Sequence, residues 1–314
     1  MYTFFNIFQK FFTSHVILYH ATFSRVPKNL AKGLHNVAPE ELYKQLKWLK
    51  KNFNIVSIDE LFEFKRSGMA AITFDDAYQS VFKEAMPAIK SLNVPATIFI
   101  NGCSLNGNIL WRDKIRFLIN NSLESEFINY FAKISASAKL LTKENFYWTS
   151  KSVNINSREI DQALDGFFKE HNISLNQMDY CLKDKSLLVP DELITYGNHS
   201  FSHYNLSSLN EEEQRKDIIK NYELLKQLGV KLSRVFSIPF GGKKHFNEAT
   251  IKIINNLGYK GYLLSSNRIN MKFYPELYSL PYAERYMAAP TFNLFKKQIF
   301  KSGLKEIINS ITKK

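Results

Sequence analysis

The chain has 314 residues, 45% of them hydrophobic, and a formal net charge of +13. This composition excludes a disordered or low-complexity chain, because it offers enough apolar surface for one large core or two smaller ones. Two cysteines occur, Cys103 and Cys181, and their wide separation in the sequence implies neither a disulfide framework nor a zinc ribbon. This cysteine usage suits a reducing compartment.

The N-terminal run "MYTFFNIFQKFF" is apolar but short, and it lacks a basic start and a small-residue cleavage site. It is therefore not expected to be a signal peptide. No run approaches the roughly 18 apolar residues that span a bilayer. We expect a cytoplasmic protein, with the inner membrane face as an alternative location. No nucleic acid partner is expected, because the lysines are spread along the chain without a nucleic-acid-binding motif.

Short apolar runs alternate with helical patterns along the chain. These runs predict strands at 15–20, 54–58, 70–74, 96–100, 193–197, 234–238 and 261–265. They are continuous rather than alternating, which is typical of strands buried on both faces. Amphipathic helices are predicted over 39–52, and from Ser208, where a Ser208-x-x-Glu211 spacing suggests a capping box, to Gly229. This order predicts a parallel α/β fold, either a barrel or a doubly wound sheet.

Two further segments define the domain organisation. Residues from about 103 to 188 carry helical patterns but no strong strand, which is far too long for an ordinary loop. We interpret them as a helical insertion within a single domain that covers residues 1–314. The tail, about residues 291–314, predicts a basic amphipathic helix. Such a helix either makes a peripheral membrane contact or packs on the protein's own core.

Two polar pairs each follow an expected strand. The stretch "AAITFDDAYQS" ends in the adjacent acids Asp75 and Asp76, which either share a cation or simply cap the next helix. In "NHSFSH", His199 and His203 are four residues apart, a spacing that converges on one ion if the segment is a helical turn. Because parallel strands end at one rim, the two pairs are expected to meet. They predict a hydrolytic zinc-type site in which one acid holds the metal and the other accepts a proton.

A third segment at the same rim is "RVFSIPFGG", which ends in a glycine-rich turn after Pro239 and Phe240. Such a turn lets backbone N–H groups approach a ligand or an oxyanion closely. The alternative interpretation is an ordinary connection between a strand and a helix.

The segments "TFDDAYQS", "GNHSFSHYNLSSL" and "FSIPFGG", in this order, resemble the first three motifs of the polysaccharide deacetylases, the NodB-homology carbohydrate esterases. "VILYHAT" and "ILWRDKIRFLI" resemble features of the bacterial branch found among surface-polysaccharide biosynthesis proteins. The resemblance covers roughly residues 15–285. It implies a distorted (β/α)7 barrel, a divalent metal that is most often zinc, and removal of an N- or O-acetyl group from a sugar.

The resemblance also implies roles for individual residues. Asp75 matches the general base, and the metal ligands would be Asp76, His199 and His203. Ser200 matches the residue that steadies the loop after the first histidine. Pro239 and Phe240 match the motif that lines the site and whose backbone N–H contacts the oxyanion.

The sequence departs from the family at the supporting positions. Ser237 stands where many members have an arginine that buttresses the base, and Tyr282 stands where related sequences often show another. No histidine occupies the late position that usually supplies the general acid. Arg285 is therefore a candidate for reaching into the site. His20, at the end of the first predicted strand, either lines the site or has a structural role.

Three classes of function stay open at this point. The first is a metal-dependent deacetylase acting on an acetylated sugar, a glycan or a lipid-linked precursor. The second is a non-catalytic relative that binds glycan or serves as a scaffold, in line with the missing arginine and histidine. The third is a peripheral membrane scaffold built on the basic tail. Within the first class, a deacylase for another acyl group, such as formyl, also stays open.

Overall fold

The computed structural model describes residues 13–178, 180–271 and 275–312, with the backbone alone from residue 304 onward. Among the segments outside this part are the apolar N-terminal run, which is not expected to be a signal peptide, and the last two residues of the tail. The strands are β1 (Thr13–Tyr19), β2 (Asn54–Ile55), β3 (Met69–Phe74), β4 (Ala96–Ile100), β5 (Ile194–Asn198), β6 (Leu232–Ser237), β7 (Gly261–Leu264), β8 (Asn270–Met271), β9 (Glu276–Leu277), β10 (Leu280–Glu284) and β11 (Tyr286–Met287).

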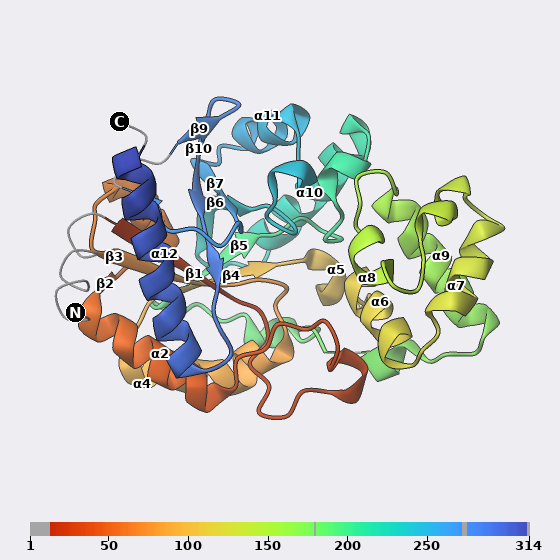
Figure 1. Cartoon of the computed structure of the whole chain (residues 1–314), viewed down its shortest axis with the longest axis horizontal. Helices are drawn as coiled ribbons and strands as arrows, with labels where there is room; N and C mark the ends of the chain where they lie inside the picture. Colours follow the sequence, from red (N-terminus) through yellow and green to blue (C-terminus); the bar gives the residue numbers. More distant parts are fainter. Residues whose placement is uncertain (1–12, 179, 272–274, 313–314) are drawn as a thin grey trace.

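The main sheet runs in the order β11-β1-β3-β4-β5-β6-β7-β10-β9 (Figure 1). Neighbouring strands from β11 through to β10 are parallel. One continuous segment bridges the two sides of the sheet, because β10 pairs with β7, β11 pairs with β1, and Arg285 alone separates β10 from β11 in the chain. The sheet therefore closes on itself, and the expected distorted (β/α)7 barrel is confirmed.

Two strand predictions need correction. The strand expected over 54–58 is only β2, because Ser57 ends the extended run and caps the next helix, accepting a hydrogen bond from the Glu60 N–H. The closing segment β10–β11 was not predicted at all. Its sequence "LPYAERYM" contains a proline and two charged residues, and it lacks the continuous apolar run of the other strands.

The helices outside the insertion are α2 (Pro39–Asn52), α3 (Ile58–Phe64), the π-helical turn η2 (Val81–Ala85), α4 (Met86–Leu92), α10 (Glu211–Lys226), α11 (Glu248–Asn256) and α12 (Phe292–Thr312). The prediction of α2 is confirmed in both bounds. The capping box at Ser208 is wrong, since α10 is capped by Asn210, whose side chain accepts from the Glu213 N–H. Ser208 donates instead to the Asn205 carbonyl.

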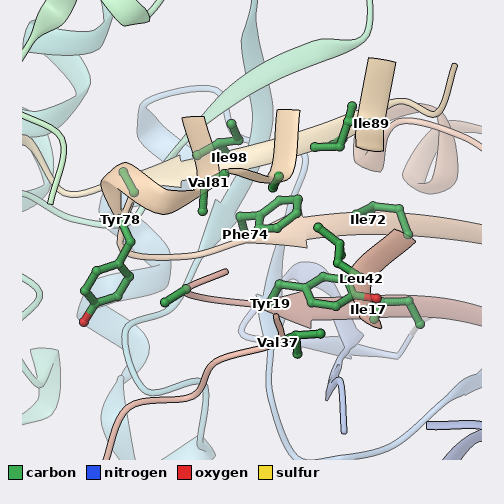
Figure 2. Packing of buried hydrophobic residues seen from close by; sticks show 14 of the residues in the cluster. Ile17, Tyr19, Val37, Leu42, Ile72, Phe74, Tyr78, Val81, Ile89 and Ile98 are labelled. Atoms are coloured by element: carbon green, nitrogen blue, oxygen red, sulfur yellow. The ribbon is translucent and has the colours of Figure 1, made fainter. Parts of the chain in front are cut away.

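The largest hydrophobic cluster packs β1, β3 and β4 against α2 and α4 (Figure 2). Tyr19 and Phe74 stack with their ring centroids 5.3 Å apart, and both are fully buried. The Tyr19 hydroxyl donates to the Gln45 side chain, so its one polar group is satisfied inside the core. This core fixes the ends of β1 and β3, from which His20 and the acid pair emerge.

The helical insertion follows β4 and precedes β5, as the sequence predicts, and lies to one side of the sheet (Figure 1). Its elements are α5 (Gly102–Leu105), α6 (Trp111–Asn120), α7 (Glu124–Ala132), η3 (Ala136–Leu140), α8 (Phe146–Thr149), α9 (Ser157–Glu170), η4 (Leu175–Met178) and η5 (Lys185–Leu187). Their apolar side chains form a cluster separate from the barrel core. Phe240 and Tyr204 pack against this cluster, which joins the insertion to the rim of the barrel.

The tail forms the long helix α12, which lies against α2 (Figure 1). Phe295 and Ile299 are buried in the barrel core, and Phe295 contacts the Trp48 ring at 6.2 Å. The first half of the helix thus packs on the protein itself. Within the described residues, no helix combines the length and apolar character needed to cross a bilayer. The membrane contact of the tail and the cytoplasmic location stay predictions.

Candidate metal and catalytic centre

Every residue predicted for the site lies where a parallel strand of the barrel ends. His20 follows β1, Asp75 and Asp76 follow β3, His199 and His203 follow β5, Pro239 and Phe240 follow β6, and Arg285 joins β10 to β11. The carboxyl ends of the strands form one rim, so the topology brings these distant segments together.

Asp76, His199 and His203 form a cluster in which one ligand atom from each lies within 4.8 Å of the others. The His203 Nε2 atom is 3.4 Å from Asp76 Oδ1, and the His199 Nε2 atom is 3.7 Å from it. Ligand atoms about 2.1 Å from a tetrahedral metal lie about 3.4 Å apart. Asp76 Oδ1 is buried and has no hydrogen-bond partner in the described structure. The cluster therefore fits a small divalent cation.

The histidine pair does not lie on a helical turn, contrary to the sequence interpretation. Residues 199–203 form an irregular loop in which Ser200 and His203 have positive φ angles of 61° and 57°. Asp76 also has a positive φ, of 70°. Such conformations are strained for residues with side chains and cluster at functional sites. The two imidazoles converge through this loop geometry rather than through helical periodicity.

Hydrogen bonds within the histidine loop and from two other elements hold its conformation. The Asp217 carboxylate accepts from the backbone N–H groups of Phe201 and Ser202 at 3.1 Å each. Ser200 Oγ accepts from the His203 N–H, so Ser200 acts within the loop. The Trp111 indole N–H, from α6 of the insertion, donates to the His203 carbonyl at 2.9 Å.

A further contact of the histidine loop fixes the tautomer of His199. His199 Nδ1 is 2.8 Å from the Ser237 carbonyl, which can only accept, so the ring carries its proton on Nδ1. Its Nε2 lone pair then faces the two aspartates, which is the form that binds a metal. Burial lowers the pKa of His199 and that of His203, which favours neutral imidazole at both positions.

Arg285 makes a bidentate ion pair with Asp75, with both N–O distances 2.8 Å. Ser237 Oγ lies 3.2 Å from Asp75 Oδ2 and accepts from Arg285 Nη2 at 2.9 Å. An arginine thus supports this acid from the closing strand, and Ser237 fills the space at the end of β6. Tyr282 stays away from the acids and stacks on Tyr262.

The two adjacent acids have opposite environments. Burial alone would raise the pKa of Asp75, but the Arg285 guanidinium outweighs it and lowers the pKa to about 2. Burial raises the pKa of Asp76 to about 7, and the charges of Asp75 and Asp113 add to this against the attraction of Arg116. Without a cation, only Asp75 is therefore fully ionised at neutral pH. Neighbouring carboxylates with separated pKa values can take different chemical roles.

His20 belongs to a histidine pair that the sequence interpretation missed. His20 Nδ1 lies 3.1 Å from His35 Nδ1, and His35 Nε2 lies 2.7 Å from the Ala288 carbonyl. The carbonyl requires a proton on His35 Nε2, so neutral His35 accepts at Nδ1 and His20 donates from its own Nδ1. His20 Nε2 is left free of this pair. His20 and Asp75 are close enough for each to shift the pKa of the other.

The third rim element is the turn after β6. Phe240 has a φ of 62°, and its ring contacts the His203 ring at 4.6 Å and the Trp111 ring at 6.1 Å. Among the described residues, no group accepts a hydrogen bond from the Phe240 N–H. Pro239 sets the turn before it. This backbone N–H is therefore available to a ligand, as the resemblance implies.

A cavity of about 410 Å³ lies beside the histidine loop, and its lining includes Cys103, Lys114 and Tyr204. None of the Asp75, Asp76 and His199 side chains lines it. Lys114 there is already paired with Asp161 and Asp165. The chemistry-bearing groups are thus gathered at the barrel rim and not in this cavity.

The polysaccharide deacetylase family model matches residues 64–122 and 171–262. The matched residues include both acids, both histidines and the turn at Phe240, and they leave out the middle of the insertion. No curated protein matches the chain.

Solved structures show the same fold at low identity. The Streptococcus pyogenes deacetylase PplD, in complex with acetate, is 16% identical with a TM-score of 0.55, covering 92% of this chain and 97% of that one. IcaB from Ammonifex degensii is 14% identical with a TM-score of 0.55, covering 93% and 97%. BC0361, a polysaccharide deacetylase from Bacillus cereus, is 13% identical with a TM-score of 0.52, covering 93% and 69%. With the motif residues of the family model assembled at one rim of this fold, the chain belongs to the polysaccharide deacetylase family.

Proposed function

We propose that the protein is a metal-dependent hydrolase that removes an acetyl group, in N-acetyl linkage, from a sugar of a surface glycan or its lipid-linked precursor. The observation that carries this proposal is the pairing of two adjacent acids with separate environments: Asp76 faces two imidazoles, and Asp75 is held ionised by Arg285. This arrangement supplies both a cation site and a base next to it.

Asp76, His199 and His203 would hold the metal, and zinc suits two imidazoles and one carboxylate better than magnesium or calcium does. When bound, such a cation lowers the pKa of a water ligand and polarises a carbonyl group. His199 is already in the required tautomer because of the Ser237 carbonyl. The ring of Phe240 covers His203 and keeps water away from that side.

Asp75 acts as the general base in this proposal. It accepts a proton from the attacking water while the oxygen of that water bonds to the acetyl carbon. Arg285 and Ser237 use the outer lone pairs of the carboxylate and fix its plane. The Phe240 N–H donates to the oxygen on which negative charge develops.

The leaving nitrogen must gain a proton as its bond to the acetyl carbon breaks. We assign this step to His20, because His35 accepts from His20 Nδ1 in the neutral and in the protonated state of His20. Burial and the charge of His35 hold the pKa of His20 well below its usual range, so protonated His20 is a strong acid; it carries its second proton on Nε2, away from His35, and gives it to the amine. The proton on Asp75 then leaves to solvent and His20 takes up a proton from solvent, and these two transfers together restore the enzyme. Replacing His20 with Gln should lower kcat at least 100-fold with metal content unchanged; retained turnover would mean that Asp75 itself returns the proton.

The experiment that tests the function is acetate release from a panel of N-acetylated and O-acetylated sugars and oligosaccharides. The protein is assayed as purified, after chelation, and after addition of zinc. Release that is lost on chelation and restored by zinc supports the proposal. Release of formate or a longer acid from matched substrates would identify another acyl group. A protein that binds zinc and glycan without releasing any acid would be a non-catalytic relative.

A further inference from the structure

A group of basic side chains lies beside the candidate centre, around the ring of Phe240. We call Arg112, Lys151, Lys244 and His245 the basic rim. Lys244 belongs to it because, together with burial, its charge contributes to lowering the pKa of Lys151 and that of His245. The Phe240 ring is 4.6 Å from the His203 ring and 5.2 Å from the His245 ring. The Lys151 ammonium and the Arg112 guanidinium lie 5.2 Å and 5.7 Å from the same ring. The basic rim is therefore one aromatic ring away from a metal ligand.

The cations of the basic rim have no acidic partners. Within the described part of the chain, no carboxylate forms an ion pair with Arg112, Lys151 or Lys244. The neighbouring cations of α6 differ, since Arg116 pairs with Asp113 and Lys114 with two aspartates. Arg112 is nevertheless 3% exposed. Its guanidinium donates to Ser150 Oγ and to the Tyr147 carbonyl, so its hydrogen bonds are made inside the protein, while no carboxylate of the described residues pairs with its charge.

Burial and nearby positive charge shift the pKa values of two side chains in and beside the basic rim. Burial and the charge of Arg112 lower the pKa of Lys151 to about 8. Although burial raises the pKa of Tyr147, the charges of Arg116, Arg112 and Lys151 outweigh it and lower this pKa to about 8. Both shifts have the sign expected for unbalanced positive charge.

His245 adds a directed donor to this group. Its Nδ1 accepts from the Gly242 N–H at 3.1 Å, so the neutral ring carries its proton on Nε2. That Nε2 atom is buried and has no partner in the described structure, and the side chain as a whole is 5% exposed. An N–H group in this position needs an acceptor to be satisfied.

An exposed aromatic platform completes the surroundings. Trp148, on α8, is 67% exposed, and the Lys151 ammonium lies 4.5 Å from its ring. Tyr147 meets Trp148 edge to face at 5.1 Å. Exposed indole faces suit the apolar face of a sugar ring, and the cations around it suit an acidic substituent on that sugar.

We propose that the basic rim is a subsite for an anionic group, a phosphate or a carboxylate, on the sugar that neighbours the acetylated sugar in the substrate. This inference rests on the proposed function and narrows its substrate to acidic glycans. The substituent accepts from Lys151, from Lys244 and from His245 Nε2, while its sugar stacks on Trp148. Some of the positive charges behind the net charge of +13 then serve to bind the anionic substituent of the substrate.

Binding to an inactive protein tests the subsite separately from turnover. Zinc-loaded Asp75→Asn protein is titrated with three matched N-acetylglucosamine tetramers: a neutral one, one with a phosphate monoester on the sugar next to the reducing end, and one with a carboxylate there. We expect at least one anionic tetramer to bind 10-fold or more tightly than the neutral one, with tryptophan fluorescence as the readout. The comparison of the two anions identifies the chemistry that the rim prefers.

Variants of the basic rim identify the residues that bind the anionic group. Adding Lys151→Gln or Lys244→Gln should reduce the affinity for the anionic tetramer at least 5-fold and leave the neutral one unchanged. Lys139→Gln, an exposed lysine of the same insertion outside the basic rim, should change neither. Equal affinities for neutral and anionic tetramers, or equal losses for both in the rim variants, would overturn the subsite. A protein that releases no acetate but keeps the anion preference would remove the proposed reaction and leave the subsite standing.

Discussion

At the level of single residues, the structure separates two acids that are adjacent in sequence. Asp75 pairs with a guanidinium and lies 3.4 Å from His199 Nε2, whereas Asp76 lies near both imidazoles and, within the described residues, has no lysine or arginine paired with it and has an unpartnered oxygen. The motif in the sequence indicates that the pair is functional. It does not indicate which residue supports the base, because Arg285 follows the acid pair by more than two hundred positions in the chain.

Removing the guanidinium should destabilise the protein through Asp75. The pKa of this carboxyl is lowered to about 2 in the folded state, so its contribution is present above its unfolded pKa near 4 and is lost as the pH falls toward 2. Arg285→Gln leaves a buried, unpaired carboxylate, which costs about 3 to 5 kcal/mol at pH 7. Thermal unfolding should show this deficit at pH 7 and a smaller one at pH 3. An equal deficit at both pH values would contradict the ion pair as its cause.

Removing the charge of Asp76 should have the opposite effect and raise the stability of the metal-free protein. Its folded pKa is raised to about 7, so ionising it destabilises the metal-free protein progressively as the pH rises from about 4 to 7. Asp76→Asn should therefore stabilise the chelated protein at pH 8, by roughly 3 to 4 kcal/mol if the charge is the only difference. At pH 4 the gain should vanish. Denaturant unfolding in the presence of a chelator measures both values, and a gain that is the same at pH 4 and 8 would refute the electrostatic cause.

At the level of secondary-structure elements, the two histidines of the site depend on a loop that other elements hold. His199 and His203 lie at the end of a strand, as their sequence position predicts, but not on the helical turn that their spacing suggests. Their spacing cannot distinguish a helical turn from a loop with two left-handed residues, because the difference lies in contacts with Asp217 and Trp111. Similarly, β10–β11 could not be predicted, since its strand character comes from pairing with β7 and β1 rather than from its own residues.

The indole of Trp111 links the insertion to the metal ligand. Trp111→Phe keeps most of the packing with Phe240 but removes the N–H that donates to the His203 carbonyl. Loss of one buried hydrogen bond costs about 1 to 3 kcal/mol. We expect a weaker zinc affinity, about 10-fold, with little change in the far-ultraviolet circular dichroism. Competition against a fluorescent chelator measures the affinity; an unchanged value would show that α6 does not position His203.

At the level of the whole molecule, the barrel is closed by a segment that carries a site residue. Arg285 lies between β10 and β11, so closing the sheet and supporting the base occur together. The positions of most of the barrel strands follow from the apolar runs, which predicted them to within a few residues. The histidine pair of His20 and His35 depends on the closing segment too, through the Ala288 carbonyl. The sequence around His20 and His35 does not predict that the two rings meet, because their contact forms only in the assembled barrel.

The tail helix should contribute to the stability of the barrel. Phe295 is fully buried against the core that includes α2, so Phe295→Ala should lower the free energy of unfolding by about 3 to 5 kcal/mol. Leu294→Ala, an exposed neighbour on the same helix, should change it by less than about 0.5 kcal/mol. Binding of both variants to anionic liposomes tests the membrane alternative. A loss of liposome binding in Leu294→Ala, with stability unchanged, would support a membrane role for the exposed face.

The measurement that tests the central claim most directly is zinc content together with acetate release for Asp75→Asn and His203→Ala, beside the wild-type protein. Asp75 does not bind the cation in this account, so Asp75→Asn should keep one zinc per chain and lose acetate release by at least 1000-fold. His203→Ala should lose both together. If Asp75→Asn retained most of the acetate release, or lost its zinc, the division of the two acids into a base and a metal ligand would be wrong.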